Sequence, residues 1–444
     1  MKNYVAIGLI IILGACQSDE NGHAKKYEFE MFSPSELKAD LNTLYNRLDS
    51  VHFDLYHLHT KEEFQTVVDS LDAAIFDSMD VAEFYWHLLP IFEMVEDAHS
   101  ALIFPRTYTE QFSEQGGAFI PLKLFVKGGN VYVEENYTGQ NIPHGSMITH
   151  INEMPVNEIL GDLRMMWNPE IESAEEIDMG FFLPRMLYPF YGFDQQFEIK
   201  LYSPERKRLS AALKGISLEA FPKSNKPDFR FYELDSAIGV MEILRCENKP
   251  GFAAFCDSVF IELQSQEFTH LIIDIRDNSG GSTFHGDTLF TYLTDEKFTQ
   301  YPKVELKYSK YVDPEIDSTF KVMYDDDWEK AFDNPKRFEG NVFMLANINS
   351  FSSASVMAAT FKCYEMGTLV GQETGGTQIF YDEPVLLKLP NTGLLFLASY
   401  QLRWCPCGES MKRGIIPDIE VEWSFDDFVN GGDTEMEVVR TLIR

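Results

Sequence analysis

The first part of the chain carries apolar side chains at helical spacing. Residues 33–36 (SPSE) combine an N-cap, a first-turn proline and a capping-box acid, so a helix is expected to begin there and continue through Leu48. Two further helices are expected at about 61–71 and from about 81 to 96. Together these segments predict a small helical domain over residues 31–110.

The pattern then changes to short runs in which apolar and polar residues alternate. Such runs at 120–126 and 130–135 predict two strands, and Gly128 and Gly129 between them predict a hairpin turn. A strand at 147–152 and a helix at about 155–163 are expected to follow. This alternation predicts a β-rich domain.

After a proline- and lysine-containing stretch at 204–228, which predicts a linker, fully apolar runs alternate with amphipathic ones. Strands alternating with helices imply parallel crossovers, so the fold class is predicted as α/β and multidomain. The expected strands are 239–244, 270–275, 342–346 and 368–372, and the expected helices are 251–265, one from about 286 and 354–366.

A cluster of four serines lies between the apolar run 342–346 and the helix that follows. A hydroxyl at such a turn projects from the end of a sheet, where N–H groups of the first helical turn can stabilise negative charge. Ser352 is therefore a candidate nucleophile. The alternative is that Ser350, Ser352, Ser353 and Ser355 only cap the helix and form the turn.

Composition limits the classes of function. The 444 residues exceed what one core usually supports, and the 45% hydrophobic content suffices for two or three domains. The formal net charge of −33 argues against nucleic acid and anionic membrane surfaces as partners. No ligand cluster accompanies the cysteines, so no metal and no cofactor are expected, and a disulfide involving Cys405 or Cys407 stays open.

The N-terminal residues are typical of an export signal. One early lysine precedes an apolar run from Val5 to Leu13, which is too short to span a bilayer. Residues 13–16 (LGAC) resemble a bacterial lipoprotein cleavage box, which implies lipidation of Cys16 and a tether over 17–30. The expected location is the cell envelope of a bacterium, anchored by lipid to the outer membrane. A plain secretion signal is the alternative.

Four motifs occur in an order that resembles the tail-specific (C-terminal-processing) serine peptidase family. They are DAHS at 97–100, DIRDNSGG at 274–281, SFSSAS at 350–355 followed by GQETGG, and GIIPD at 414–418. The resemblance implies a PDZ-like domain over 111–215, in which GSMITHINEMPV corresponds to the phrase closing the peptide groove. It also implies a crotonase-like α/β catalytic domain over 216–444. The expected partners are peptide or protein C-termini, added as a strand to a sheet edge. A β-rich spacer without a ligand is the alternative.

The same resemblance implies serine-type peptide hydrolysis by Ser352. One branch of the family has a lysine twenty-five residues after the nucleophile, where this chain has Thr377, so His99 is the expected base, as in the tricorn-like branch. The amide of Gly280 or Gly281, together with that of Ser353, is expected to form the oxyanion hole.

Two positions depart from the tricorn-like pattern. Ala98 stands where that branch has a serine, and Met411 stands where it has a glutamate that would orient the histidine. Glu409 and Asp97 are the candidate substitutes. The alternative function is a noncatalytic lipoprotein that binds peptides or apolar ligands on the same scaffold, as the retinoid-binding members of this superfamily do.

Overall fold

The computed structural model describes residues 27–444 except 168, 170, 172–173, 175, 224–225, 316–318 and 325–333. The predicted signal at 1–16, the lipidation site Cys16 and residues 17–26 of the tether lie outside the described residues. Within the part of the chain that is described, no helix is both long and apolar enough to cross a membrane.

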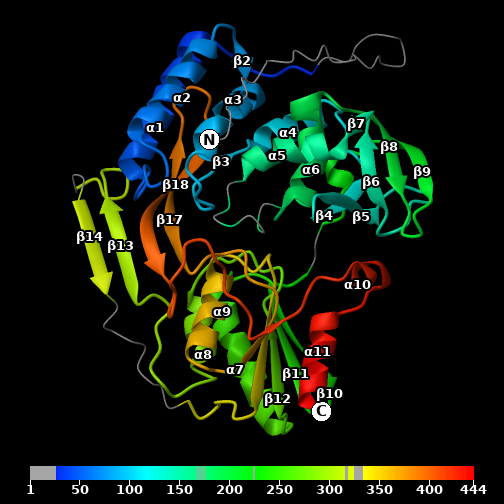
Figure 1. Ribbon diagram of the computed structural model, residues 1–444, viewed down its shortest axis with the longest axis vertical. Coiled ribbons are helices and arrows are strands. Elements are labelled where there is room, and N and C mark those ends of the chain that lie inside the picture. Colours follow the sequence, from blue (N-terminus) through cyan, green and yellow to red (C-terminus); the bar gives the residue numbers. More distant parts are fainter. Residues whose placement is uncertain are drawn as a thin grey trace.

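Helices form the N-terminal unit, as the apolar spacing predicted (Figure 1). Capping boxes at Ser33, Thr60 and Asp80 start the three longest of them, because each N-cap residue is followed at N3 by a glutamate. The apolar stripes of these helices pack into one core with residues of a later strand. The elements are β1 (Met31–Phe32), α1 (Pro34–Val51), α2 (Lys61–Ala74), β2 (Met79–Asp80), α3 (Val81–Glu93), β3 (Leu102–Ile103) and α4 (Arg106–Glu114).

A separate antiparallel sheet follows in the order β4-β5-β6-β8-β9, and β7 pairs with β6. The predicted Gly128–Gly129 turn joins its first two strands. The prediction of a linker over 204–228 is wrong for residues 208–214, which form strand β9. The basic side chains of this strand face solvent, and its Leu213 is buried. The elements are β4 (Leu122–Lys127), β5 (Asn130–Asn136), β6 (Met147–Ile151), β7 (Met154–Pro155), α5 (Val156–Leu163), α6 (Met179–Tyr191), β8 (Gln196–Tyr202) and β9 (Arg208–Lys214).

The core sheet has the order β10-β11-β12-β15-β16-β19 and is parallel except for β10 at one edge. Residues of α7, α8 and α9 pack on one face and residues of α11 on the other, so the apolar strands are buried on both sides. This arrangement confirms the predicted α/β multidomain class. The elements are β10 (Phe229–Asp235), β11 (Ile238–Ile243), α7 (Lys249–Ser265), β12 (His270–Asp274), α8 (Phe284–Phe290), β15 (Asn341–Ala346), α9 (Ser353–Cys363), β16 (Thr368–Gly371), β19 (Ile419–Glu420), α10 (Phe425–Asn430) and α11 (Thr434–Ile443).

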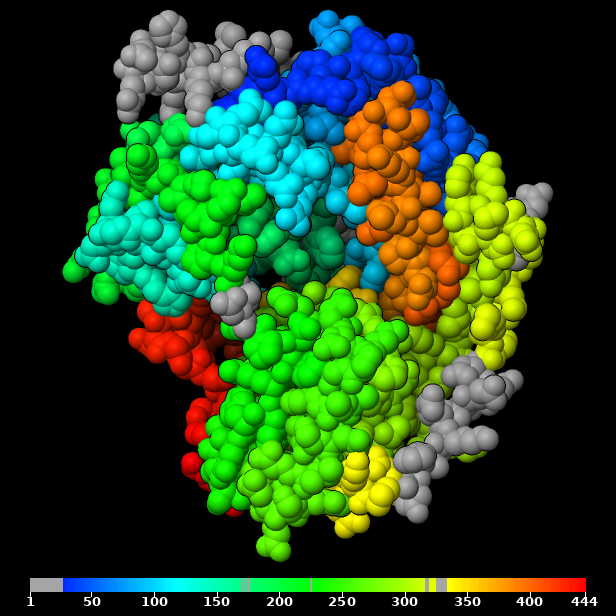
Figure 2. Space-filling view, turned by 180° about the vertical axis from the view of Figure 1, so that it is seen from behind, coloured from blue at the N-terminus to red at the C-terminus, as the bar shows by residue number. Residues whose placement is uncertain are grey.

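A second antiparallel sheet, which the sequence pattern did not predict, connects the core to the helical unit. Its order is β14-β13-β18-β17, with β13 (Lys303–Tyr308), β14 (Thr319–Tyr324), β17 (Ile379–Lys388) and β18 (Leu395–Trp404). The short strand β3 pairs with β18 near the helical end. Figure 1 shows β17 and β18 running from the core up to α1. Figure 2, from behind, shows a hollow bordered by the orange segment that contains these strands.

Candidate active site

The serine cluster lies at the turn between β15 and α9, as expected, and only one of its hydroxyls faces another side chain of the site. The Ser350 hydroxyl donates to the Ile275 carbonyl (2.8 Å), that of Ser355 to the Ser350 carbonyl (2.7 Å), and that of Ser353 to the Gly281 carbonyl (2.6 Å). Ser352 makes no capping bond to the helix. The hydroxyls of three of the four serines therefore donate to backbone carbonyls, and Ser352 is the remaining candidate for the nucleophile.

The backbone at Ser352 is held in a conformation that side chains seldom adopt. Its φ is 50° and its ψ is −123°, and such a residue is maintained only by tight surroundings. Two glycines supply them: a Cβ at Gly280 would lie 2.7 Å from Ser352 Cβ, and one at Gly376 would lie 3.0 Å from Ser352 N. A strained serine at a strand-to-helix turn exposes its hydroxyl in the manner of a nucleophile elbow.

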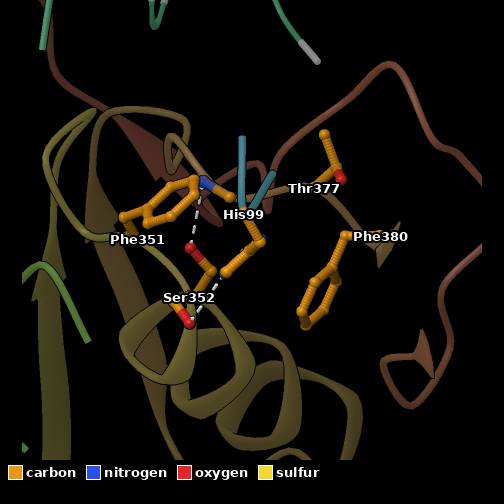
Figure 3. Close-up of a pocket in the computed structure, with 7 residues that line it drawn as sticks. His99, Phe351, Ser352, Thr377 and Phe380 are labelled. Carbon is orange, nitrogen blue, oxygen red and sulfur yellow. Dashed lines mark hydrogen bonds between the residues drawn. The ribbon is translucent and has the colours of Figure 1, made fainter. Parts of the chain in front are cut away.

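The folded chain brings His99 to Ser352 from a position 253 residues earlier. The distance from His99 Nε2 to Ser352 Oγ is 3.1 Å. The imidazole stacks between Phe351 (ring centroids 5.0 Å apart) and Phe380 (5.6 Å), which fixes its plane. Figure 3 shows the His99 ring directed at Ser352, with Phe380 beyond it. The geometry is that of a hydroxyl and a base within proton-transfer distance.

The turn that carries His99 is held by a buried pair, Asp97 and His52, which are 1% and 0% exposed. One Asp97 oxygen accepts the His99 backbone N–H (2.8 Å), and the other lies 3.2 Å from His52 Nε2. The Asp54 N–H donates to His52 Nδ1 (3.2 Å), so the tautomer with hydrogen on Nε2 satisfies both contacts. Burial alone would raise the pKa of Asp97, but the hydrogen bond and electrostatic effect of His52 hold that pKa well below its usual range.

Further contacts tie the same turn to the second antiparallel sheet. The Ser399 N–H donates to Ser100 Oγ (2.9 Å), and the Leu397 N–H donates to the Ala101 carbonyl (2.8 Å). His52 also packs on Tyr381 of β17, with ring centroids 4.9 Å apart. The position of His99 therefore depends on a sheet that forms from residues nearly 300 positions later.

Two N–H groups beside Ser352 are available as donors. Among the described residues, neither Gly281 N–H nor Ser353 N–H has a hydrogen-bond acceptor. The Gly280 N–H differs, because it donates to the buried Asn278 side chain (2.8 Å). The prediction of Gly280 as an alternative donor is therefore wrong for this conformation, and its role is to allow the close approach of Ser352.

The two carboxylates expected as possible partners of the His99 ring do not contact its nitrogens. Asp97 binds the main chain of His99, and Glu409 is exposed, with its N–H donating to Gln378 (3.0 Å). A third carboxylate, Asp382 on β17, lies 3.9 Å from His99 Nε2. The sequence reasoning missed both Asp382 and His52. The only signal for Asp382 was its place in the strand that begins just after the GQETGG phrase.

A small pocket lies next to these side chains. It is lined by His99, Phe351, Ser352, Ser355, Gly376, Thr377 and Phe380. Thr377, the position at which the other family branch has a lysine, thus faces the same pocket. No group of three or more metal-ligating side chains occurs in the described ranges. A disulfide joins Cys407 to Cys363 at the far end of α9, and Cys405 is a free, buried thiol.

Comparison with solved structures shows the fold shared along most of the chain. Mature CPAF complexed with lactacystin superimposes with a TM-score of 0.66, at 16% identity over 92% of this chain and 98% of that chain. A putative peptidase from Parabacteroides merdae gives a TM-score of 0.50, at 17% identity over 93% of this chain and 96% of that chain. No curated protein sequence matches the chain significantly.

A family model adds the assignment that these low identities cannot give. It is the model of peptidase family S41, and it matches residues 237–421, the segment that contains Gly281, Ser352 and Ser353. Residues 237–421 of this chain therefore form a segment that matches peptidase family S41.

Proposed function

We propose that the protein is a serine-type endopeptidase in which Ser352 is the nucleophile and His99 the general base. The observation that carries the proposal is the 3.1 Å distance between His99 Nε2 and Ser352 Oγ. Supporting it, the three neighbouring serines have structural bonds, and the N–H groups of Gly281 and Ser353 have no acceptor among the described residues. These are the parts that acyl transfer needs: a nucleophile, a base and oxyanion donors.

In this proposal the Ser352 oxygen attacks the carbonyl carbon of the scissile amide while its proton passes to His99 Nε2. The N–H groups of Gly281 and Ser353 stabilise the oxyanion of the tetrahedral intermediate. The proton then moves from Nε2 to the leaving nitrogen as the C–N bond breaks, which leaves an ester on Ser352. Water, deprotonated by His99, hydrolyses that ester and regenerates the hydroxyl.

A serine-reactive fluorophosphonate tests this proposal. The wild-type protein should be labelled on Ser352, Ser352→Ala should lose the label and about a thousandfold or more of any peptide cleavage, and both proteins should unfold at the same temperature. Ser258→Ala, on the exposed side of α7, is the control that keeps the label. Absence of label on wild-type Ser352 together with absence of cleavage would favour the noncatalytic binding protein.

We also propose that the antiparallel sheet of the predicted PDZ-like domain recruits peptide C-termini by strand addition. The sheet ends in β4 and β9. Gly180 at the start of α6 packs on the Leu124 carbonyl, which covers the β4 edge. The exposed edge strand β9 is the remaining platform.

A proline on β9 tests this docking site. The Ser203 N–H donates to the Lys207 carbonyl, so alternation along β9 points the N–H of Ser210 away from β8. Ser210→Pro should weaken binding of a fluorescent peptide with a free C-terminus and leave labelling of Ser352 intact. Equal binding by Ser210→Pro and wild type would refute docking on β9.

The proposed location is the bacterial cell envelope, with a lipid on Cys16 and peptides or proteins exported to the same compartment as substrates. The support is the order of charged, apolar and small residues before Cys16. Expression of Cys16→Ser in a bacterium should move the protein from the membrane fraction to the soluble fraction. Retention of that variant in the membrane would contradict the lipid anchor.

A further inference from the structure

Among the described residues, a carboxylate approaches the ring nitrogens of His99 from one side only, the side that faces the nucleophile. His99 Nδ1 is buried and has no hydrogen-bond partner among the described residues. Asp382 Oδ1 lies 3.9 Å from Nε2, and in the described part of the chain it is the one carboxylate within ion-pair distance of this ring. The His99 and Asp382 side chains are 11% and 13% exposed, so solvent screens their interaction weakly.

The strand β17 explains why Asp382 and Phe380 act on the same ring. Residues two apart in a strand point to the same face, so the side chain that stacks on His99 and the carboxylate next to it come from one face of β17. The sheet therefore delivers an apolar surface and a negative charge to His99 together.

Arg403 on the neighbouring strand β18 fixes the Asp382 carboxylate. Its Nη1 lies 2.9 Å from Asp382 Oδ2, its Nη2 lies 2.8 Å from Glu383 Oε1, and its Nε donates to Gln401 (2.9 Å). The guanidinium also lies over the Tyr301 ring, 4.6 Å from its centroid. One guanidinium paired with two carboxylates leaves a net charge of −1 beside His99.

We propose that Asp382 is the positioning residue of the catalytic base: it holds the His99 ring and offsets the positive charge the ring acquires on taking the Ser352 proton. This inference rests on the proposed peptidase function. It assigns to β17 the role that a carboxylate hydrogen-bonded to Nδ1 has in a serine-histidine-aspartate triad. Here the Asp382 carboxylate lies near Nε2 instead, and Nδ1 has no hydrogen-bond partner among the described residues.

The charged and titratable groups around His99 determine whether loss of the Asp382 charge makes His99 a weaker or a stronger base. Asp382, paired with Arg403, faces the ring from the antiparallel sheet, and the partly buried Tyr301 lies against that guanidinium. Asp97 with His52 lies beneath the His99 main chain. A neighbouring carboxylate stabilises the positive charge that the imidazole acquires on taking the Ser352 proton, so removal of the Asp382 charge should weaken His99 as a base. The base then takes the Ser352 proton less readily, and the reaction slows.

The test compares Asp382→Asn with Glu383→Gln. Both variants remove one carboxylate from Arg403, but Glu383 has no contact with His99 among the described residues and is 52% exposed. The environment of the His99 imidazole is followed by NMR of the full chain with labelled histidines, and His99→Gln identifies its signal among the 10 histidines. The rate of Ser352 labelling by a fluorophosphonate is measured for the same variants.

We expect the imidazole resonances of His99 to shift in Asp382→Asn and to stay unchanged in Glu383→Gln. The rate of Ser352 labelling should fall about tenfold in Asp382→Asn, and Asp382→Glu should recover part of the rate. Unchanged His99 resonances with an unchanged labelling rate in Asp382→Asn, or equal changes in both variants, would overturn the proposal. Shifted His99 resonances in Asp382→Asn, when the wild-type protein is neither labelled nor active, would instead reject the peptidase function and keep the charge contact.

Discussion

The turns that carry Ser352 and His99 face each other across 3.1 Å, but they are built in different ways. The Ser352 turn is made by a contiguous strand-turn-helix segment and is closed by Gly280 and Gly376. The His99 turn has short local bonds, but its place depends on His52 and on the later strands β17 and β18. One half of the site is thus built within the α/β core, and the other half needs the helical unit and the second antiparallel sheet.

This difference predicts that substitutions around His99 and substitutions around Ser352 will have different effects. Changes beneath His99 should remove folding stability first, because they break a buried network shared by the helical unit and the antiparallel sheet. Changes beside Ser352 should remove reactivity at a smaller cost in stability, because they distort one turn on an otherwise intact core.

The largest expected effect on stability is that of His52→Ala. This substitution removes the donor to one oxygen of the buried Asp97 carboxylate, while its other oxygen still accepts the His99 N–H, and the expected cost is about 3 kcal/mol. The temperature of thermal unfolding and the labelling rate of Ser352 should both decrease. His52→Gln, which keeps an N–H donor, is the matched control and should lose clearly less. A wild-type unfolding temperature for His52→Ala would show that the pair does not support the His99 turn.

Gly280→Ala should have an intermediate effect on stability and a severe effect on reactivity. Gly280 has a φ of 99°, and a Cβ there would approach Ser352 Cβ to 2.7 Å and the Phe351 carbonyl to 2.9 Å. We expect a loss of about 1–3 kcal/mol and at least about a tenfold slower labelling of Ser352. Gly139→Ala is the control, since a Cβ there meets no atom within 4 Å. Unchanged labelling of Gly280→Ala would contradict the close packing beside the nucleophile.

The smallest expected effect is a loss of folding stability as the pH falls from about 6.5 to about 5. One histidine of the helical unit and one of the core contribute to it. Burial lowers the pKa of His87 in the helical unit and of His285 beside the glycine loop of the core. A histidine whose pKa is lower in the folded protein binds protons more readily when unfolded, so acidification favours unfolding. Unfolding temperatures measured at several pH values should show this decline.

Single replacements separate the two contributions to this pH dependence. His87→Gln and His285→Gln should each flatten the decline by part of its size, because each removes one buried group that titrates. If neither variant changes the slope, other groups govern the acid sensitivity of the protein.

The sequence by itself determined the local elements of the core and the nucleophile turn. The apolar run before the serine cluster, the glycines of DIRDNSGG and the helix after Ser353 follow from residues close in the chain, and they formed as expected. The capping boxes likewise fixed where the N-terminal helices begin. Such features are readable because capping, strand burial and glycine conformation depend on neighbouring residues.

Only the tertiary structure decided what surrounds His99. The pairing of β3 with β18, the burial of His52 against Asp97 and the approach of Asp382 to the imidazole join segments about 45 to 300 residues apart. No periodicity in the chain encodes such contacts, because strand partners in an antiparallel sheet are selected by the packing of distant faces. The hydroxyl is thus set by its strand-turn-helix segment and the adjoining glycine loop of the core, whereas the base and its charge environment exist only once the whole chain has folded.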